Sequence, residues 1–444
     1  MKRYTHRELK FVFWRRWLGK IPNFNSRCVY FLLFILLAGC ASKSATSDDL
    51  ISIQILDRNG FSETISAKDR LKNYEQADFT APQPYQKVVR IFGKPNLGKT
   101  SSIITTYHSN GQTWQYLEIE NGRAHGQFIE WHPNGVNKLE ATVIAGTPDL
   151  GEAAQMTWLF DGDSHVYDEQ GHLIASIPYN KGLLDGPSRH YYANGKLLKE
   201  IPYERDEIHG IVRLMNEEGT CVEKIGYSHG EKHGTAIAYW TPAQFKYREV
   251  SDNGHLMKAE YFNPQGEKVA GIENGEGNQA VFENGKLTSL LEYHKGVVDG
   301  AVQHFNSQGQ LTAILSIKDG AKNGEEWEYY SSNEKKPKLY LQWNDDVIEG
   351  VAKTWYENGV MESQREMHDN KKHGLSFAWF KEGDLMFMEE YENDQLIKGS
   401  YFKKWEKNPI SKIENGKGVA TLFDQDGKFL KKITYDKGLP QNDF

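Results

Sequence analysis

One stretch of the sequence has the residue types and spacing of a phosphate-binding loop. Residues Gly93–Thr100 (GKPNLGKT) match the pattern G-x-x-x-x-G-K-[ST], and the apolar run Val88–Phe92 precedes them. Such a loop binds phosphate where it opens a helix, because the N-terminal amides of the helix complete the anion site. The β-branched segment Ser101–Tyr107 instead predicts a strand that ends in the turn Ser109–Gly111. We therefore predict a tight surface turn, and a nucleotide-binding P-loop enzyme is the less favoured alternative.

Four histidines share one position of a repeated pattern, which could suggest a metal site: His125, His209, His233 and His373. Zinc lies about 2.0–2.1 Å from each ligand atom, so ligands of one ion must lie within about 4 Å of one another. If each repeat contributes two strands, equivalent residues of adjacent repeats lie about 10 Å apart. Elsewhere the same position holds Asp185, Asp299, Asn323 and Glu349. We therefore predict no metal, and a turn residue that hydrogen-bonds its own backbone.

Cys221 is the remaining candidate for chemistry, with His229 and His233 nearby in the sequence. Nucleophilic catalysis needs a base and an orienting group assembled with the thiol. Cys221 follows a hairpin turn at an ordinary strand position, so we predict a half-buried strand thiol. No catalytic residue, no cofactor and no small-molecule substrate is predicted.

The elements that carry these residues recur with a period of about 24. The recurring form is that of Ile119-Glu-Asn-Gly122-Arg-Ala-His125-Gly126, which closes on a glycine. A fixed period in this range indicates a repeat protein. The closing glycines are Gly126, Gly186, Gly210, Gly234, Gly300, Gly324, Gly350 and Gly374.

The interior of each repeat predicts two strands. A turn, typically Asn-Gly as in Asn134-Gly135, lies nine residues after the closing glycine. Asn and Gly accept positive φ, which a tight hairpin requires. The flanking segments are short, β-branched and aromatic, and alternate in polarity. An aromatic residue five positions after the glycine should form a stabilising column along one face: Trp131, Tyr191, Tyr239, Phe305, Tyr329, Trp355 and Trp379.

The predicted fold is all-β, an elongated antiparallel β-meander of hairpin repeats. The elements Tyr-x-x-Gly-x-x-His/Asp-Gly and aromatic-x-x-Asn-Gly resemble the bacterial variant of MORN repeats over about residues 101–438. This resemblance implies a β-hairpin scaffold without catalytic residues. It also implies an alternative function, because some bacterial members are described as antitoxins of toxin–antitoxin pairs.

The N-terminus resembles a bacterial lipoprotein signal. A basic segment precedes the apolar run Cys28–Leu37, which suits a signal peptide and is shorter than the ~20 residues of a membrane-spanning helix. Leu37-Ala38-Gly39-Cys40 resembles a lipoprotein cleavage box, so Cys40 would become the first residue and carry lipid. An uncleaved N-terminal anchor is the alternative. Ala41, by resemblance to Gram-negative lipoproteins, favours the outer membrane.

Charge argues against nucleic acid as a partner. Removal of residues 1–39 removes eight Lys or Arg and one Glu, which leaves 45 basic and 59 acidic residues and a net charge near −14. An acidic surface repels phosphate backbones. Cys221 would then be the one cysteine without lipid, so the mature chain could form no internal disulfide.

We expect a domain order of signal peptide 1–39, tether 40–49, N-terminal cap 50–100, repeat array 101–438 and tail 439–444. The cap should contain a strand pair over Leu50–Ile65 and one short helix, Ser66–Glu75, with Ser66 as its N-cap. The array loses its pattern at 144–166 and 241–277, and such insertions often form loops on the binding face. The predicted protein is a non-enzymatic, lipid-anchored scaffold of the cell envelope, with the membrane and other proteins as its partners.

Overall fold

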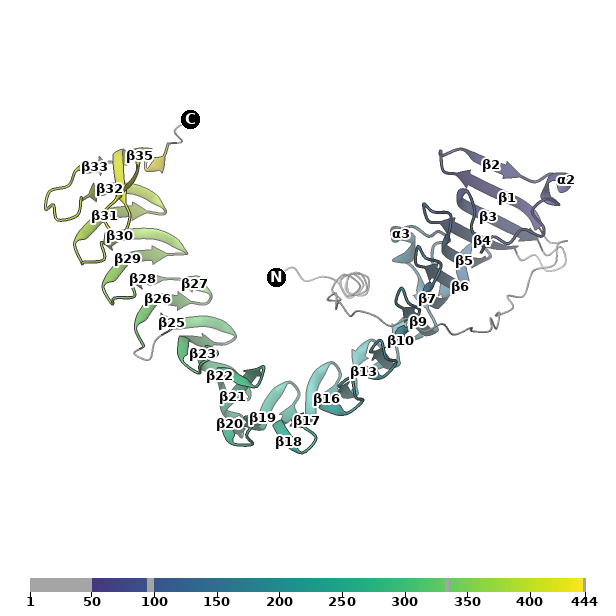
Figure 1. Cartoon of the computed structure of the whole chain (residues 1–444), viewed down its shortest axis with the longest axis horizontal. Helices are drawn as coiled ribbons and strands as arrows, with labels where there is room; N and C mark the ends of the chain where they lie inside the picture. Colours follow the sequence, from purple (N-terminus) through teal and green to yellow (C-terminus); the bar gives the residue numbers. More distant parts are fainter. Residues whose placement is uncertain (1–49, 94–99, 332–334, 442–444) are drawn as a thin grey trace, which may run out of the picture. The chain divides into compact units, whose positions relative to one another are not determined.

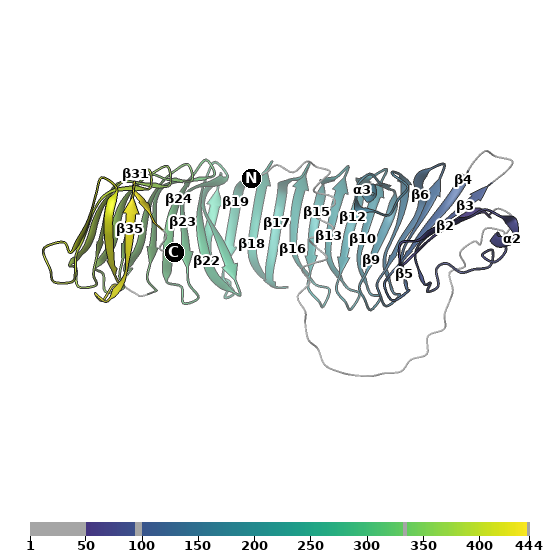
Figure 2. The same ribbon diagram turned by 90° about the horizontal axis from the view of Figure 1, so that it is seen from above.

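The computed structural model describes residues 50–93, 100–331 and 335–441 (Figure 1). The chain divides into two compact units, residues 1–208 with 217–219 and residues 209–216 with 220–444. Within each unit, strands that follow one another along the chain pair antiparallel, as β16 to β19 show in Figure 2. The predicted all-β meander of hairpin repeats is confirmed.

Over its described residues the first unit contains two short helices, and the elements there are β1 (Leu50–Asp57), β2 (Ser62–Ile65), α2 (Lys68–Leu71), β3 (Tyr85–Gly93), β4 (Thr100–Tyr107), β5 (Thr113–Glu120), β6 (Arg123–Trp131), β7 (Asn137–Ala145), α3 (Glu152–Gln155), β8 (Leu159–Phe160), β9 (Gly162–Tyr167), β10 (Leu173–Asn180), β11 (Leu183–Leu184), β12 (Gly186–Tyr191), β13 (Leu197–Glu204) and β14 (Glu207–Ile208).

The described residues of the second unit contain strands and no helix, namely β15 (Gly210–Met215), β16 (Cys221–Ser228), β17 (Glu231–Thr241), β18 (Gln244–Asp252), β19 (His255–Phe262), β20 (Lys268–Glu273), β21 (Glu276–Glu283), β22 (Lys286–His294), β23 (Val297–Phe305), β24 (Leu311–Lys318), β25 (Ala321–Tyr329), β26 (Pro337–Asn344), β27 (Val347–Ile348), β28 (Gly350–Trp355), β29 (Met361–His368), β30 (Lys371–Trp379), β31 (Leu385–Glu392), β32 (Gln395–Tyr401), β33 (Ser411–Glu414), β34 (Lys417–Phe423), β35 (Phe429–Asp436) and β36 (Leu439–Pro440).

The start of the first unit departs from the simple meander. β1 pairs with β2, as predicted, and on its other side with β3. The helix prediction was too long, because α2 covers only Lys68–Leu71. Ser66 is not its cap, since Ala67 holds the N-cap position without a side-chain hydrogen bond. Leu71 and Phe79 both enter the buried cluster around Ile53, which requires the chain to turn back soon after this one helical turn.

The two ends of each hairpin use different turns. At Asn121-Gly122 both residues have positive φ (51° and 70°), which indicates a two-residue turn of type I′. At the other end, the N–H of His132 donates to the carbonyl of Val136 at 2.8 Å, and of Asn134 and Gly135 only the glycine has positive φ. The expectation that Asn-Gly uses two positive φ values at this turn was therefore wrong. It is a three-residue turn in which glycine makes a bulge.

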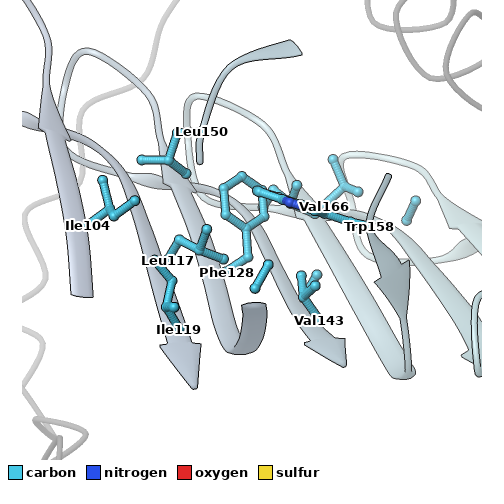
Figure 3. Packing of buried hydrophobic residues seen from close by; sticks show 12 residues of the cluster. Ile104, Leu117, Ile119, Phe128, Val143, Leu150, Trp158 and Val166 are labelled. Carbon is cyan, nitrogen blue, oxygen red and sulfur yellow. The ribbon is translucent and has the colours of Figure 1, made fainter. Parts of the chain in front are cut away.

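The stretch 144–166 lost the repeat pattern because it supplies part of a hydrophobic core. It contains α3 and places Leu150 and Trp158 over Phe128 (Figure 3). The rings of Phe128 and Trp158 meet edge to face with centroids 4.8 Å apart. Leu150 and Trp158 of this insertion thus cover the sheet face, whereas Met156 and Leu159 remain exposed.

The stretch 241–277 also lacks loops of the expected kind, since it forms β18, β19 and β20. It belongs to what we call the first curled segment, residues 232–296, which recurs as the second curled segment, residues 372–438. The two share residues at spacings of 140 to 142: Lys232/Lys372, Glu249/Glu389, Leu256/Leu396, Tyr261/Tyr401, Ile272/Ile413, Asn274/Asn415, Gly275/Gly416, Gly277/Gly418, Phe282/Phe423, Tyr293/Tyr435 and Gly296/Gly438. Residues 297–371 between them are called the plain repeats.

Backbone hydrogen bonds between three turns define each curl. The N–H of Leu256 donates to the carbonyl oxygen of Gly296 at 2.8 Å. The N–H of Gly296 donates to the carbonyl oxygen of Gly275 at 3.0 Å, and the N–H of Gly275 donates to that of Met257 at 2.9 Å. In the second segment, Leu396 donates to Gly438, Gly438 to Gly416, and Gly416 to Ile397, at 3.1, 2.9 and 2.9 Å. Turns about 40 residues apart thus meet, and the sheet bends over its own core.

Candidate functional site

The residues that resembled a phosphate-binding loop are followed by a strand. Lys94–Lys99 lie outside the described residues. Beyond them β4 runs antiparallel to β3, with Gly93 opposite Thr100. The strand predicted after this sequence is confirmed, and the helix N-terminus that a phosphate site would use is not present there.

The shared histidine position connects adjacent hairpins. His125 Nδ1 lies 3.0 Å from the carbonyl oxygen of Ile144, and His233 Nδ1 lies 3.4 Å from a carboxylate oxygen of Asp252. At the same position, Asn323 donates to Asp345 at 2.9 Å, and Glu349 accepts from His368 at 2.7 Å. The expected hydrogen bond to the residue's own backbone was therefore wrong at these positions, because the partner belongs to a neighbouring strand or turn. Among the described residues, no group of three or more His, Cys, Asp or Glu side chains is arranged to hold a metal ion.

Cys221 is a half-buried free thiol at the start of β16. Its Sγ donates to the carbonyl oxygen of Glu223 at 3.5 Å, and Met215 lies opposite it in the sheet. The predicted strand thiol is confirmed. Cys40 lies outside the described residues.

Four of the closing glycines, Gly126, Gly300, Gly350 and Gly374, make room for a Glu or Gln side chain that locks the hairpin. At Gly126 (φ 121°) a Cβ atom would collide with the side chain of Glu118. Glu118 lies eight residues earlier, where the register shifts, and it accepts the N–H of Gln127 at 2.9 Å. Equivalent bonds join Glu292 to Ala301, Gln342 to Val351 and Glu366 to Leu375 at 2.7, 2.7 and 3.0 Å. The signal that sequence reasoning missed is this Glu or Gln eight residues before the glycine.

The predicted aromatic column consists of half-buried residues at a constant structural position. The register shifts just before each of them, and each except Tyr239 is the last paired residue of its strand: Trp131, Tyr191, Tyr239, Phe305, Tyr329, Trp355 and Trp379. Among the residues that the structure describes, no ring contact joins two members of this column. Trp355 instead stacks with Trp327 at 5.8 Å, and Trp379 with Phe377 at 5.9 Å.

The residue after four of the column positions connects one repeat to the next. Tyr330 donates its hydroxyl to the carbonyl of Trp355, and Tyr356 donates to that of Trp379, both at 2.7 Å. His132 and Trp240 contact the carbonyl oxygens of Tyr167 and Phe262 in the same way. These bonds fix the spacing of neighbouring hairpins.

The turns at both edges form similar bonds. Asn358 donates its amide to the carbonyl of Lys381 at 2.8 Å, as Asn110 does to Pro133 at 2.7 Å. At the opposite edge, Asp346 (φ 64°) takes the place of a turn glycine, and its carboxylate accepts the N–H of Lys322 at 2.8 Å. Asp206, Asn370 and Asp394 accept from the preceding repeat at 2.7 to 2.9 Å.

Each curled segment buries a carboxylate with tyrosine hydroxyls around it. Glu389 is buried and accepts from Tyr401 at 2.7 Å and Tyr391 at 3.0 Å. Glu249 accepts from Tyr261 at 2.7 Å. Burial, followed by the adjacent carboxylate, raises the pKa of both Tyr261 and Tyr401. These carboxylates are hydrogen-bonded within the core, so the arrangement suits structure rather than acid–base chemistry.

Two exposed histidines have carboxylate partners at the turn edge. A hydrogen bond to Glu276 raises the pKa of His294, and a hydrogen bond to Glu349 raises that of His368. The Nδ1–oxygen distance is 2.7 Å in both pairs. Both pairs tie one turn to its neighbour.

A comparison with known protein families finds a repeat family within the array. Two stretches match the MORN repeat variant. They are residues 184–205, from β11 into the turn after β13, and residues 348–369, from β27 into the turn after β29. No curated protein matches the chain. The MORN-type repeats form a scaffold, and this all-β fold is typical of non-catalytic repeat proteins.

Within the described part of the chain, no helix has the length and apolar character needed to cross a bilayer.

Proposed function

We propose that the protein is a lipid-anchored protein of the cell envelope that binds other proteins through its repeat array. The observation that carries this proposal is the use of the repeat-specific polar side chains. Those at the turns and bulges bond neighbouring hairpins to one another, as Asn358, Tyr356 and Asp346 do. Such residues maintain a surface, and the side chains that vary between repeats are left to contact partners.

The Leu37–Cys40 sequence supports the anchor, and the acidic balance of the chain after Cys40 favours protein partners over nucleic acid. Ala41 supports an outer-membrane location. A cytoplasmic, antitoxin-like protein remains the alternative on the family resemblance alone.

The anchor is tested by metabolic labelling with palmitate. The full-length protein should carry the label and partition with membranes, and Cys40→Ala should abolish both. Cys221→Ala is the matched control, because its thiol lies within a strand, and it should keep the label. An unlabelled wild-type protein in the soluble fraction would reject the anchor and favour the antitoxin-like alternative.

Protein binding is tested by cross-linking in intact envelopes. Deletion of 241–277 would not be a clean test, because it removes β18–β20 and core residues such as Tyr261. Point substitutions of exposed residues are preferable. We expect defined cross-linked partners for the wild-type protein, and an envelope preparation that yields none would contradict the scaffold function.

A further inference from the structure

A comparison of the two curled segments shows one surface that is present only in the second of them. In the first copy, Phe262 leads into the compact turn Asn263–Glu267, where the N–H of Asn263 donates to the carbonyl of Glu267 at 3.0 Å. In the second copy, Phe402 leads into the longer loop 403–410, and the chain from Tyr401 to Ile413 is one residue longer than the chain from Tyr261 to Ile272. The cores on either side are equivalent, so the core does not require the different loop.

Trp405 is the most distinctive residue of this loop. Its side chain is 69% exposed, and its φ is +69°. A bulky residue in the left-handed region is a conformational outlier, and such outliers occur preferentially at functional sites. Ile410, on the same loop, is also exposed. Neither of these apolar side chains belongs to the buried core of the segment.

Neighbouring turns hold the loop in place. Lys404 Nζ lies 3.0 Å from a carboxylate oxygen of Glu382 and donates to the carbonyl of Asp426 at 3.2 Å. The same ammonium group lies 5.2 Å from the centre of the Trp405 ring. The exposed Phe429 follows the turn that contains Asp426. Trp405 therefore stands on a loop that is bonded to the turn before Phe429.

The charge of the second copy also differs. Residues 258–295 carry four Lys and six Glu, whereas residues 398–437 carry ten Lys and five Asp or Glu, with no Arg in either. Lys403, Lys404 and Lys381 have carboxylate partners. Among the described residues, none of the ion pairs includes Lys407, Lys428, Lys431 or Lys432. An acidic protein thus has a local basic surface around an exposed tryptophan.

We propose that Trp405, Ile410 and Phe429, with Lys407 and Lys428, form a docking surface for an acidic polypeptide segment that carries an apolar side chain. This inference rests on the proposed function of a protein-binding scaffold. Tryptophan is enriched among residues that dominate binding energy, and surrounding lysines select carboxylates. Glu382, Asp424 and Asp426 at the adjacent turns and the acidic chain as a whole limit the basic area to a few lysines, so a short acidic segment fits better than an extended anionic bilayer.

The test is a selection of short random peptides displayed against the full-length protein, purified in detergent. Enriched peptides should combine Asp or Glu with an apolar residue. Their Kd should rise about ten-fold or more in Trp405→Ala. Lys407→Glu should raise it several-fold and reduce its dependence on salt. Gln265→Ala, in the equivalent turn of the first copy, is the matched control and should leave the Kd unchanged.

Several results would overturn the proposal. If the enriched peptides bind Trp405→Ala as tightly as the wild-type protein, this surface is not their binding site. That result would leave the proposed scaffold function unaffected. Failure to enrich acidic peptides would also reject the docking surface, as would Trp405-dependent binding only to phosphatidylglycerol vesicles. Trp405-dependent dimerisation in sedimentation velocity would assign the surface to a second copy. Loss of palmitate labelling would reject the anchor alone.

Discussion

The curled segments bury whole side chains, whereas the plain repeats between them bury few. Leu396 and Tyr401 are 0% exposed and Tyr261 is 1% exposed, but the most buried aromatic of the plain repeats, Tyr356, is still 6% exposed. Both regions use the same hairpin and the same two turn types. The hairpin unit by itself therefore does not determine how much core a repeat protein forms.

A short sequence difference produces the curl. A plain repeat places the closing glycine four residues after the turn glycine, as in Gly320 and Gly324, but Gly275 and Gly277 are only two apart. Gly277 has φ 136°, and a Cβ atom there would collide with the carbonyl oxygen of Gly271. At Gly275 a Cβ atom would lie 2.6 Å from the backbone nitrogen of Gly296. The motif Asn-Gly-x-Gly lets three backbones meet where only glycine fits.

In the plain repeats, by contrast, bonds between neighbours take the place of a core. The Tyr330 hydroxyl, the Asp346 carboxylate and the Asn358 amide each bond the adjacent hairpin. The stability of such an array is approximately a sum of repeat and nearest-neighbour terms. We expect the curled segments to be the local maxima of stability within the second unit.

The largest difference should appear when leucine is truncated. Leu396→Ala in the second curled segment should reduce the free energy of unfolding by about 2–5 kcal/mol, because it leaves a cavity in a closed core. Leu315→Ala in the plain repeats is the matched change at a half-buried position and should cost less than about 2 kcal/mol. Hydrogen exchange resolved by segment would measure both. Equal effects would contradict the contrast between the two regions.

Removal of one tyrosine hydroxyl should have the next largest effect. Tyr401→Phe keeps the ring but deprives the buried Glu389 of a donor, which should cost about 1.5–3 kcal/mol. Tyr340→Phe removes a donor to the exposed carboxylate of Glu325, 3.0 Å away, and should cost less than about 1 kcal/mol. Urea titration followed by segment-resolved hydrogen exchange measures the two losses. A larger loss for Tyr340→Phe would refute the assigned role of Glu389.

The sequence predicted the plain repeats better than the curled segments, and the reason is physical. The strands, the period and the closing glycines follow from local patterns, and the structure confirms the hairpin meander. The curl was missed, because Leu256 bonds to a turn 40 residues later and the motif at Gly275–Gly277 breaks the period on which the reasoning depended. The stretch 144–166 was missed similarly, since Trp158 packs on Phe128, which lies 30 residues earlier.

The candidate residues show the same limit. Trp405 and the lysines around it have no periodic signal, and their meaning emerges only when the two curled segments are compared. The strand after residue 100 and the strand position of Cys221 were predicted correctly, because both depend only on the local sequence. The partners of the shared histidine position depend on which turns are adjacent, and single-sequence periodicity did not show this.

Alkaline pH should weaken the curled segments before the plain repeats. The pKa values of Tyr261 and Tyr401 are raised by burial and then by Glu249 and Glu389. Because their pKa is higher in the folded state, these tyrosines contribute their full share to the free energy of unfolding below the ordinary tyrosine pKa of about 10. This contribution falls as the pH rises above that value, because the tyrosines of the unfolded chain ionise first. In the plain repeats burial raises the pKa of Tyr356 only to about 12. Hydrogen exchange against pH, with tyrosinate absorbance, should show the curled segments opening first. Simultaneous opening would contradict this order.

The smallest expected effect is one that should not differ between the regions. His294 ends β22 of the first curled segment, and His368 ends β29 of the plain repeats. Each is hydrogen-bonded to a carboxylate, from Glu276 and Glu349 respectively, that raises its pKa. Their full contribution to the free energy of unfolding is present below the ordinary histidine pKa of about 6.5. It is lost as the pH rises through the higher pKa that each histidine has in the folded state. Both side chains are about half exposed, so solvent screens the pairs and the loss should be small and similar in the two segments.

An NMR titration of the histidine ring signals should give two raised pKa values. Glu276→Gln and Glu349→Gln should each return only the paired histidine to the ordinary value. A change at the other histidine would contradict the pairing of each ring with its own carboxylate.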